Sequence, residues 1–170
     1  MPKKICIVGG VAGGAGTAAR LRRLDETADI IIFERGEYIS YANCGLPYHV
    51  GGIIEDRARL LLNSPASMKE RFNVDVRVRH EATAIDRETK TIRVLNRESG
   101  ESYDESYDIL VLSTGSRPLV PPIPGIDSER IYTLWTIPDT DRIIAAIESV
   151  QAKTAVVIGG GSVLDRKSVV

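Results

Sequence analysis

Short apolar runs alternate with a glycine-rich segment and a helical segment at the start of the chain. Residues 5–8 and 30–33 are continuous apolar runs rich in β-branched side chains, and residues 9–14 contain four glycines. The segment that follows the glycines has helical character as far as Leu24. A strand, a turn, a helix and a second strand in this order predict one βαβ unit of an α/β fold.

The pattern after residue 50 predicts further elements around this unit. Residues 56–62 and 67–72 have the apolar spacing of helices, and residues 74–78 alternate with the period of a half-buried strand. A small antiparallel β-meander follows, with turns near residues 88–89 and 99–100. Its predicted strands are residues 83–86, 91–96 and 102–108.

A buried parallel strand is predicted at residues 109–112, which form a continuous apolar run. The run leads directly into Ser113, Thr114 and Gly115. Open α/β sheets bind ligands at the carboxyl ends of their strands. These three residues are therefore candidates for a ligand site.

Residues 118–125 hold four of the eight prolines and predict a semi-rigid connector. We therefore expect one domain over residues 1–117, and a connector with the start of a second domain over residues 118–170. A helix at 139–151 and a strand at 154–158 precede the glycines at 159–161. A dinucleotide-binding motif that starts at these glycines would have its last glycine near position 164, where this chain has none. We therefore expect a truncated nucleotide-binding domain.

Composition excludes several classes of function. Apolar residues make up 43% of the chain and the net charge is −1, so no basic excess indicates nucleic acid or an anionic membrane as a partner. No run approaches the roughly 18 apolar residues of a membrane span. A signal peptide is the alternative for residues 5–19, which follow two lysines, but five glycines there argue against it. Two cysteines form no disulfide framework, which favours a reducing cytoplasm.

The glycine-rich turn is typical of a dinucleotide site. Glycines allow the backbone to approach a pyrophosphate, whose charge is stabilised by the N–H groups at the start of the next helix. Glu34 lies 25 residues after Gly9, where a ribose-binding carboxylate is expected. Val11 stands in place of the second glycine, and a tight turn in an ordinary α/β domain is the alternative. The candidate cofactor-binding residues of the turn are Gly9, Gly10, Val11, Ala12, Gly13 and Gly14.

Cys44 is the candidate redox residue, because it follows the ribose-binding position by only ten residues. Its expected place is the first turn of a short helix running to Val50, where free N–H groups stabilise a thiolate. A buried apolar role is the commoner fate of a free cysteine, and we expect it for Cys6. Neither His49 nor His80 has a second ligand at metal-binding spacing, so no metal site is expected.

Arg20 and Arg23 are three residues apart on the first predicted helix, and Gly16 lies four residues before Arg20. One helix face would then present two guanidinium groups beside a bare backbone. Such a face can bind a polyanion. A solvated basic surface is the alternative.

The chain resembles the pyridine nucleotide-disulfide oxidoreductases from about residue 3 to Gly161. The features that carry the resemblance are the two glycine turns, the proline connector and the cysteine between them. Within the family it looks most like the coenzyme A-disulfide reductases, in the Gly-Gly-Val-Ala-Gly-Gly turn, the run Asn-Cys-Gly-Leu-Pro-Tyr and the segment Leu-Ser-Thr-Gly at 112–115. Dithiol members carry a second cysteine five positions after the first, where this chain has His49.

The resemblance implies an FAD-binding Rossmann-like domain of three layers with a small antiparallel meander, and then the start of a second, NAD(P)-binding Rossmann-like domain. It implies electron transfer from NADH or NADPH through FAD to Cys44, with coenzyme A disulfide as substrate. The oxidised state of a single thiol would be a mixed disulfide or a sulfenic acid. Residues implied in cofactor binding include Ser113, Thr114 and Gly115, and those implied in substrate binding are Gly16, Arg20, Arg23, Ser40 and Asn43.

Three alternatives to this function remain at the level of sequence. They are an NADH oxidase, an NADH-dependent persulfide reductase, and a catalytically inactive nucleotide-binding fragment. The resemblance also implies a homodimer for a full-length parent. Because the family completes its flavin site with sequence that is absent here, we expect the 170 residues to hold FAD weakly and to be catalytically inactive alone, in the sense that they cannot sustain turnover.

Overall fold

The computed structural model describes residues 2–158. The chain forms two compact units, which are described separately below. Unit 1 contains Met1–Tyr41 and Leu61–Gly115, and unit 2 contains Ala42–Leu60 and Ser116–Val170. The predicted glycine turn at 159–161 and the residues after it lie outside the described part. The domain boundary expected at 117/118 stays a prediction, because compactness of a unit is a different criterion from a domain boundary.

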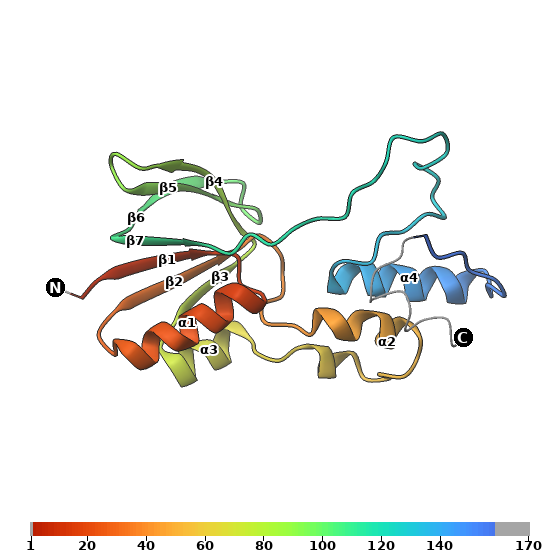
Figure 1. Ribbon diagram of the computed structural model, residues 1–170, viewed down its shortest axis with the longest axis horizontal. Coiled ribbons are helices and arrows are strands. Elements are labelled where there is room, and N and C mark those ends of the chain that lie inside the picture. The colour runs from red at the N-terminus through yellow and green to blue at the C-terminus, as the bar shows by residue number, and fades with distance from the viewer. Residues whose placement is uncertain (1, 159–170) are drawn as a thin grey trace. The chain divides into compact units, whose positions relative to one another are not determined.

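A four-stranded parallel sheet forms the centre of unit 1 (Figure 1). Its strands are β1 (Lys4–Val8), β2 (Asp29–Glu34), β3 (Asp75–Val78) and β7 (Ile109–Leu112), in the order β3-β2-β1-β7. Parallel neighbours need a crossover, and helix α1 (Ala12–Leu24) provides it between β1 and β2. The predicted βαβ unit is confirmed.

One face of this sheet is covered by helices and the other by a meander (Figure 1). Helices α1 and α3 (Pro65–Phe72) lie on the first face. Strands β4 (His80–Asp86), β5 (Thr91–Asn96) and β6 (Ser102–Ser106) form the antiparallel meander on the second. The predicted three-layer α/β fold class is confirmed, together with the meander.

The two faces of the sheet enclose two apolar cores, because side chains alternate along each strand. Ile5, Ile7 and Ile32 belong to one buried cluster with Ala15 and Ala18 of α1 and Met68 of α3. Cys6, Ile31 and Phe33 contact Ile92 and Val94 of the meander. Burial on both faces explains why β1 and β2 read as continuous apolar runs.

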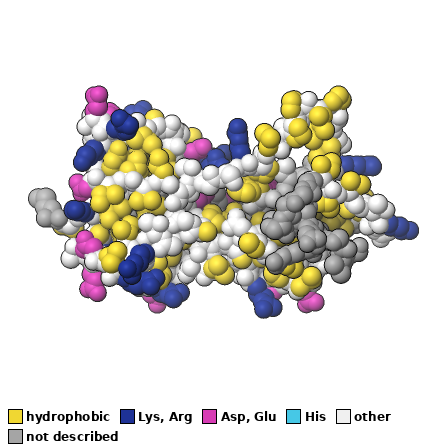
Figure 2. Space-filling view, viewed as in Figure 1, with side chains coloured by type: hydrophobic (Ala, Val, Ile, Leu, Met, Phe, Trp, Pro, Cys, Tyr) yellow, Lys and Arg dark blue, Asp and Glu magenta, His cyan; other side chains and the backbone are white. Residues whose placement is uncertain are grey.

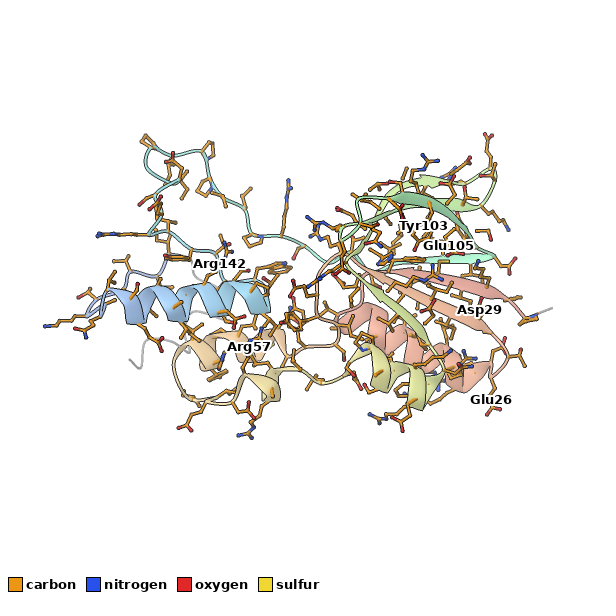
Figure 3. The ribbon with its side chains drawn as sticks, turned by 180° about the vertical axis from the view of Figure 1, so that it is seen from behind. Glu26, Asp29, Arg57, Tyr103, Glu105 and Arg142 are labelled. Carbon is orange, nitrogen blue, oxygen red and sulfur yellow. The ribbon has the colours of Figure 1, made fainter. Side chains whose placement is uncertain are left out.

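A polar network accompanies the meander-side core. Glu105 on β6 accepts hydrogen bonds from Lys4 Nζ and from an Arg77 guanidinium nitrogen, the latter at 2.6 Å. The Arg77 Cζ atom lies 5.4 Å from the Phe33 ring centre and 5.9 Å from that of Tyr103. Figure 3 shows Tyr103 and Glu105 on β6, at the side of the meander that faces the sheet. Burial raises the pKa of Glu105, but the bonds from Lys4 and Arg77 lower it more, so its net pKa is below its usual value.

We expect Glu105→Gln to destabilise unit 1 by about 1–3 kcal/mol at pH 7, because two partly buried cations lose their counter-charge. A lowered folded-state pKa means that this stabilisation is complete above about pH 4.5 and declines as pH falls through the folded pKa. The acid-side loss of stability should therefore be shallower in the variant. Urea unfolding between pH 3 and 7 measures both effects.

The matched control is Asp104→Asn, which removes a carboxylate from the exposed bidentate pair with Arg93 on the outer side of the meander. Exposed pairs contribute little, so its effect should be smaller than that of Glu105→Gln. If the two substitutions lower the free energy of unfolding equally, burial of the Glu105 network does not add to stability.

Unit 2 consists of short helices joined to one longer helix. They are the 3₁₀ helices η1 (Asn43–Gly45) and η2 (Arg57–Leu60), and the α-helices α2 (Leu46–Val50) and α4 (Ile137–Ser149). Helix α2 contacts α4. The Arg57 guanidinium donates to both carboxylate oxygens of Asp141, each at 2.7 Å. Figure 3 shows Arg57 on the segment that also carries α2.

Several predicted elements differ from those observed. Residues 56–62 form only a 3₁₀ turn at Arg57–Leu60, and the helix expected from Cys44 begins as η1, with regular α-helix only from Leu46. The predicted strand at 154–158 is wrong, because these residues have no regular structure, and Val156 and Ile158 are exposed. A strand requires a hydrogen-bonded neighbour, and none is present within residues 2–158.

Strand β7 is parallel as predicted but not fully buried. It lies at the edge of the sheet, and Ile109 and Leu112 are 41% and 58% exposed.

In unit 2, Leu119 of the connector is 91% exposed, and Figure 2 shows hydrophobic side chains gathered over the connector. Across residues 2–158, no helix combines the length and apolar character that a membrane span requires.

Candidate nucleotide and thiol sites

The glycine turn joins β1 to α1 in unit 1, in a geometry that needs glycine at two positions. Gly9 has a φ of +98°, and a Cβ there would lie 2.2 Å from the carbonyl oxygen of Ser113. A Cβ on Gly14 would lie 1.7 Å from the carbonyl oxygen of Gly9. Helix α1 can therefore start close to the end of β1 because Gly14 has no side chain, and Ser113 can lie against the turn because Gly9 has none. The observed spacing matches the reason for which dinucleotide sites use glycine.

The N-terminus of α1 is suited to an anion. Among the described residues no side chain caps it, and Val11 occupies the N-cap position. Ala12 and Gly13 in the first turn are exposed. Uncapped N–H groups and the positive end of the helix dipole together favour a phosphate. The turn that contains the predicted residues Gly9–Gly14 therefore fits the pyrophosphate of a dinucleotide.

Glu34 ends β2 beside this turn and is 9% exposed. One carboxylate oxygen accepts a hydrogen bond from the Gly10 N–H at 2.8 Å, and the other accepts one from the Gly36 N–H at 2.7 Å. These two bonds fix the orientation of the carboxylate. A carboxylate oxygen has further acceptor capacity, so Glu34 can still bind ribose hydroxyl groups.

Ser113 is the residue of the 113–115 segment that the fold brings to the turn. Its N–H donates to the carbonyl oxygen of Val8 at 2.8 Å, and its Oγ would lie 3.2 Å from a Cβ on Gly13. Thr114 and Gly115 are exposed. Gly115 has a φ of +65°, and no described atom would lie within 4 Å of a Cβ there. Cofactor contacts of these last two residues remain predictions.

The two cysteines have opposite environments. Cys44 is exposed on η1 of unit 2, whereas Cys6 on β1 of unit 1 has no exposed surface. Burial raises the pKa of the Cys6 thiol to about 11, and its Sγ lies 3.7 Å from the Ser106 carbonyl oxygen as a weak donor. Cys6 is thus protonated and inaccessible at neutral pH. The buried role expected for it is confirmed.

Close packing in unit 2 holds the segment that carries Cys44. A Cβ on Gly45 would lie 2.8 Å from a methyl carbon of Leu60, which is fully buried. The Ala42 N–H donates to the Leu60 carbonyl oxygen, and the Gly45 N–H donates to the Ala42 carbonyl oxygen, both at 2.8 Å. Sequence analysis did not single out Gly45 or Leu60, because their contact joins segments with no common local pattern.

The basic face of α1 divides into two kinds of arginine. Arg22 donates to backbone carbonyl oxygens of Asp25, Glu26, Ala28, Phe72 and Asn73. Arg20 and Arg23 are exposed, and among the described residues neither forms an ion pair. Arg23 Nε donates a single hydrogen bond, at 3.2 Å, to the Ala19 carbonyl oxygen one turn earlier. No described atom would lie within 4 Å of a Cβ on Gly16. Arg22 is therefore structural, while its two neighbours are available to an anionic ligand.

The remaining candidates are divided between the units. Ser40 lies in unit 1, where its N–H donates to the Gly10 carbonyl oxygen at 3.0 Å and its Oγ accepts from Asn63 Nδ2 at 3.0 Å. Asn43 lies beside Cys44 on η1 in unit 2. Asn63 is a contact that the sequence did not indicate. Within the described residues, no group of three or more acidic, histidine or cysteine side chains forms a metal site.

Comparison with known proteins decides the family. The profile of the pyridine nucleotide-disulphide oxidoreductase family matches residues 3–163. The chain belongs to this family. The match confirms the predicted resemblance, and the family implies a flavin and a pyridine nucleotide as cofactors.

Individual relatives are similar over most of the chain. A coenzyme A disulfide reductase of Staphylococcus haemolyticus is 43% identical over 94% of this chain, and one of Staphylococcus aureus is 44% identical over 96%. A crystal structure of reduced Bacillus anthracis CoADR-RHD is 53% identical, with a TM-score of 0.87 over 89% of this chain and 27% of that one. The chain spans 36% of the length of the staphylococcal relatives.

Proposed function

We propose that the protein is a flavin- and NAD(P)H-dependent reductase of coenzyme A disulfide, with Cys44 as its nucleophile and redox centre. The observation that carries the proposal is an exposed thiol in the run Asn-Cys-Gly-Leu-Pro-Tyr, with His49 in place of a second cysteine. A lone accessible thiol can exchange with a substrate disulfide, but it cannot close an intramolecular disulfide at that position. The similarity to coenzyme A disulfide reductases supports the same substrate.

The first chemical step is thiol–disulfide exchange. The Cys44 thiolate attacks one sulfur of coenzyme A disulfide, the S–S bond breaks, and one coenzyme A leaves as a thiolate. Cys44 then holds the second coenzyme A in a mixed disulfide. Two electrons and one proton return the Cys44 thiolate and release coenzyme A as a thiol.

The chain's own residues position the cofactor and the substrate. The turn Gly9–Gly14 would hold the FAD pyrophosphate, Glu34 would bind the ribose, and residues 113–115 would line the flavin side. FAD would supply the two electrons, received from NADH or NADPH. Gly16, Arg20, Arg23, Ser40 and Asn43 would bind the nucleotide part of coenzyme A, and the whole protein would act as a cytoplasmic homodimer.

A second function is supported by solved structures. An NAD-dependent persulfide reductase from A. fulgidus is 38% identical with a TM-score of 0.82, and a water-forming NADH oxidase from Lactobacillus brevis is 30% identical with a TM-score of 0.81. An oxygen acceptor, or a persulfide without a nucleotide, would need no cationic binding site for phosphates. The exposed cations of α1 therefore distinguish coenzyme A disulfide from these substrates.

The double change Arg20→Ala and Arg23→Ala tests the proposal in the first half-reaction, which needs neither flavin nor nicotinamide. Contacts to phosphate contribute roughly 1.5–3 kcal/mol each where partly desolvated and less on an open surface. We expect the rate constant for coenzyme A adduct formation at Cys44 to fall at least about tenfold, which corresponds to about 1.4 kcal/mol. Mass spectrometry of the chain against time measures this rate.

Pantethine disulfide, which has no nucleotide, is the control substrate and should react at an unchanged rate. Arg87→Ala with Lys90→Ala is the control variant, because it removes the same charge from the exposed β4–β5 turn. Equal losses on both disulfides in the Arg20 and Arg23 variant would reject the nucleotide contact. No reaction of the unaltered chain with coenzyme A disulfide would reject the proposed function.

A further inference from the structure

Ser40 has a constrained backbone in unit 1. Its φ of +46° lies in the left-handed region, which non-glycine residues adopt mainly when their surroundings hold them there. The Ser40 N–H donates to the carbonyl oxygen of Gly10 at 3.0 Å, and its carbonyl oxygen accepts from the Leu62 N–H at 3.0 Å. Gly10 in turn donates its N–H to Glu34. Ser40 is therefore hydrogen-bonded directly to the glycine turn and is linked to Glu34 through Gly10.

The direction of the Ser40 hydroxyl depends on Asn63. Asn63 Nδ2 donates to Ser40 Oγ at 3.0 Å. A hydroxyl oxygen that accepts a hydrogen bond keeps its own proton for another acceptor. Within residues 2–158, Ser40 Oγ donates to no protein group. The Ser40 proton is thus available to a ligand.

Asn63 itself is not explained by stability. Its Oδ1 is buried and has no hydrogen-bond partner among the described residues. An unsatisfied buried acceptor costs about as much as a single neutral hydrogen bond contributes, or more. An apolar side chain of similar size would avoid this cost. The remaining effect of Asn63 is on Ser40.

The surroundings of Asn63 are open enough for a ligand to approach. Asn63 lines a hollow of about 490 Å³, together with Tyr38, Ile39, Leu62 and Pro65. This volume falls within the range of small-molecule sites, roughly 300–1,000 Å³. The hollow therefore reaches the Asn63 end of the hydrogen bond, while Ser40 is half-buried next to it and does not line the hollow.

We infer that Asn63 is a positioning residue that turns the Ser40 hydroxyl proton toward an acceptor oxygen of coenzyme A. The inference rests on the proposed function, in which Ser40 contacts the nucleotide part of that molecule. A carboxylate at position 63 could only accept from Ser40, so it would turn the proton inward. The Asn63 amide instead donates from Nδ2 to Ser40 Oγ, so the Ser40 proton can point toward the ligand.

The test uses Asn63→Leu, Asn63→Asp, Ser40→Ala and the double variant Asn63→Leu with Ser40→Ala. Calorimetric titration with coenzyme A, in its thiol form, gives the dissociation constant for each chain. Asn63→Leu should weaken binding about three- to tenfold, which is the range for one neutral hydrogen bond, and Asn63→Asp should weaken it further by reversing the polarity. In the Ser40→Ala background, Asn63→Leu should have no additional effect.

A thermal melt separates positioning from folding. The melting temperature of Asn63→Leu should equal or exceed that of the unaltered chain, since a buried unpaired acceptor is removed. Leu62→Ala is the control, because Leu62 lines the same hollow and is 62% exposed, and its hydrogen bond to Ser40 comes from its backbone N–H, which the substitution keeps. Its affinity for coenzyme A should change less than that of Asn63→Leu.

The affinities for coenzyme A separate a failure of this inference from a failure of the proposed function. If the unaltered chain binds coenzyme A and Asn63→Leu and Asn63→Asp bind it equally well, this inference is overturned and the proposed function stands. Additive losses in the double variant would also overturn it, because Asn63 would then act without Ser40. An unaltered chain that binds no coenzyme A would overturn both.

Discussion

Replacement of Cys44 by serine is expected to abolish the exchange reaction with coenzyme A disulfide. The reacting species is a thiolate, and a serine hydroxyl is a far weaker nucleophile at neutral pH without an adjacent general base. Cys44 is exposed on η1, so the smaller serine leaves no buried cavity and should not change the fold. We expect at least a roughly thousandfold loss of adduct formation, which is a loss of about 4 kcal/mol of transition-state stabilisation.

The measurement is the mass of the intact chain after incubation with coenzyme A disulfide, followed by identification of the modified peptide. Unaltered protein should gain one coenzyme A at Cys44, and Cys44→Ser should gain none.

Cys6→Ser provides the matched control. Cys6 is fully buried and its raised pKa, about 11, keeps it protonated at neutral pH, so its replacement should leave the exchange rate unchanged. A buried hydroxyl in its place costs about 1–3 kcal/mol of stability where it lacks a partner. An adduct on Cys6, or normal exchange by Cys44→Ser, would refute the assignment of Cys44.

Gly14→Ala should produce the largest loss of stability among single substitutions in the turn. The added Cβ would lie 1.7 Å from the Gly9 carbonyl oxygen and 3.2 Å from Ile7 Cγ2. The first of these atoms belongs to the backbone and cannot move without displacing β1 or α1. We expect a cost of about 3–5 kcal/mol, above the range for ordinary overpacking, and loss of the geometry that fits a pyrophosphate.

Gly16→Ala, two residues later on the same helix, is the matched comparison for stability. No described atom would lie within 4 Å of its Cβ, and alanine is favoured over glycine in a helix by up to about 1 kcal/mol. It should therefore stabilise unit 1 slightly. Urea unfolding at neutral pH measures both variants. Changes of the same sign and size would contradict a steric role for Gly14.

The β-elements that the sequence predicted well are those defined by local pattern. Continuous apolar runs predicted β1 and β2 because both faces of the parallel sheet are covered, and alternation with turn residues predicted the meander strands β4–β6. The glycines of residues 9–14 indicated the turn between β1 and α1, because the close approach of Gly14 to Gly9 is a local requirement, whereas the approach of Gly9 to Ser113 is tertiary. The run around Cys44 was enough to indicate the coenzyme A-disulfide reductases.

Other features depend on contacts between distant segments, so only the tertiary structure decided them. It separated Arg22, which bonds five carbonyl oxygens, from the exposed Arg20 and Arg23, although the sequence gives all three the same chemistry. The strand expected at 154–158 failed because β-pairing needs a partner that local pattern cannot supply. The bond from Asn63 to Ser40 spans 23 residues, and no periodicity relates their positions. Sequence thus determined most of the elements and the family, while folding determined which strands find a partner, which polar groups are used internally and which remain for a ligand.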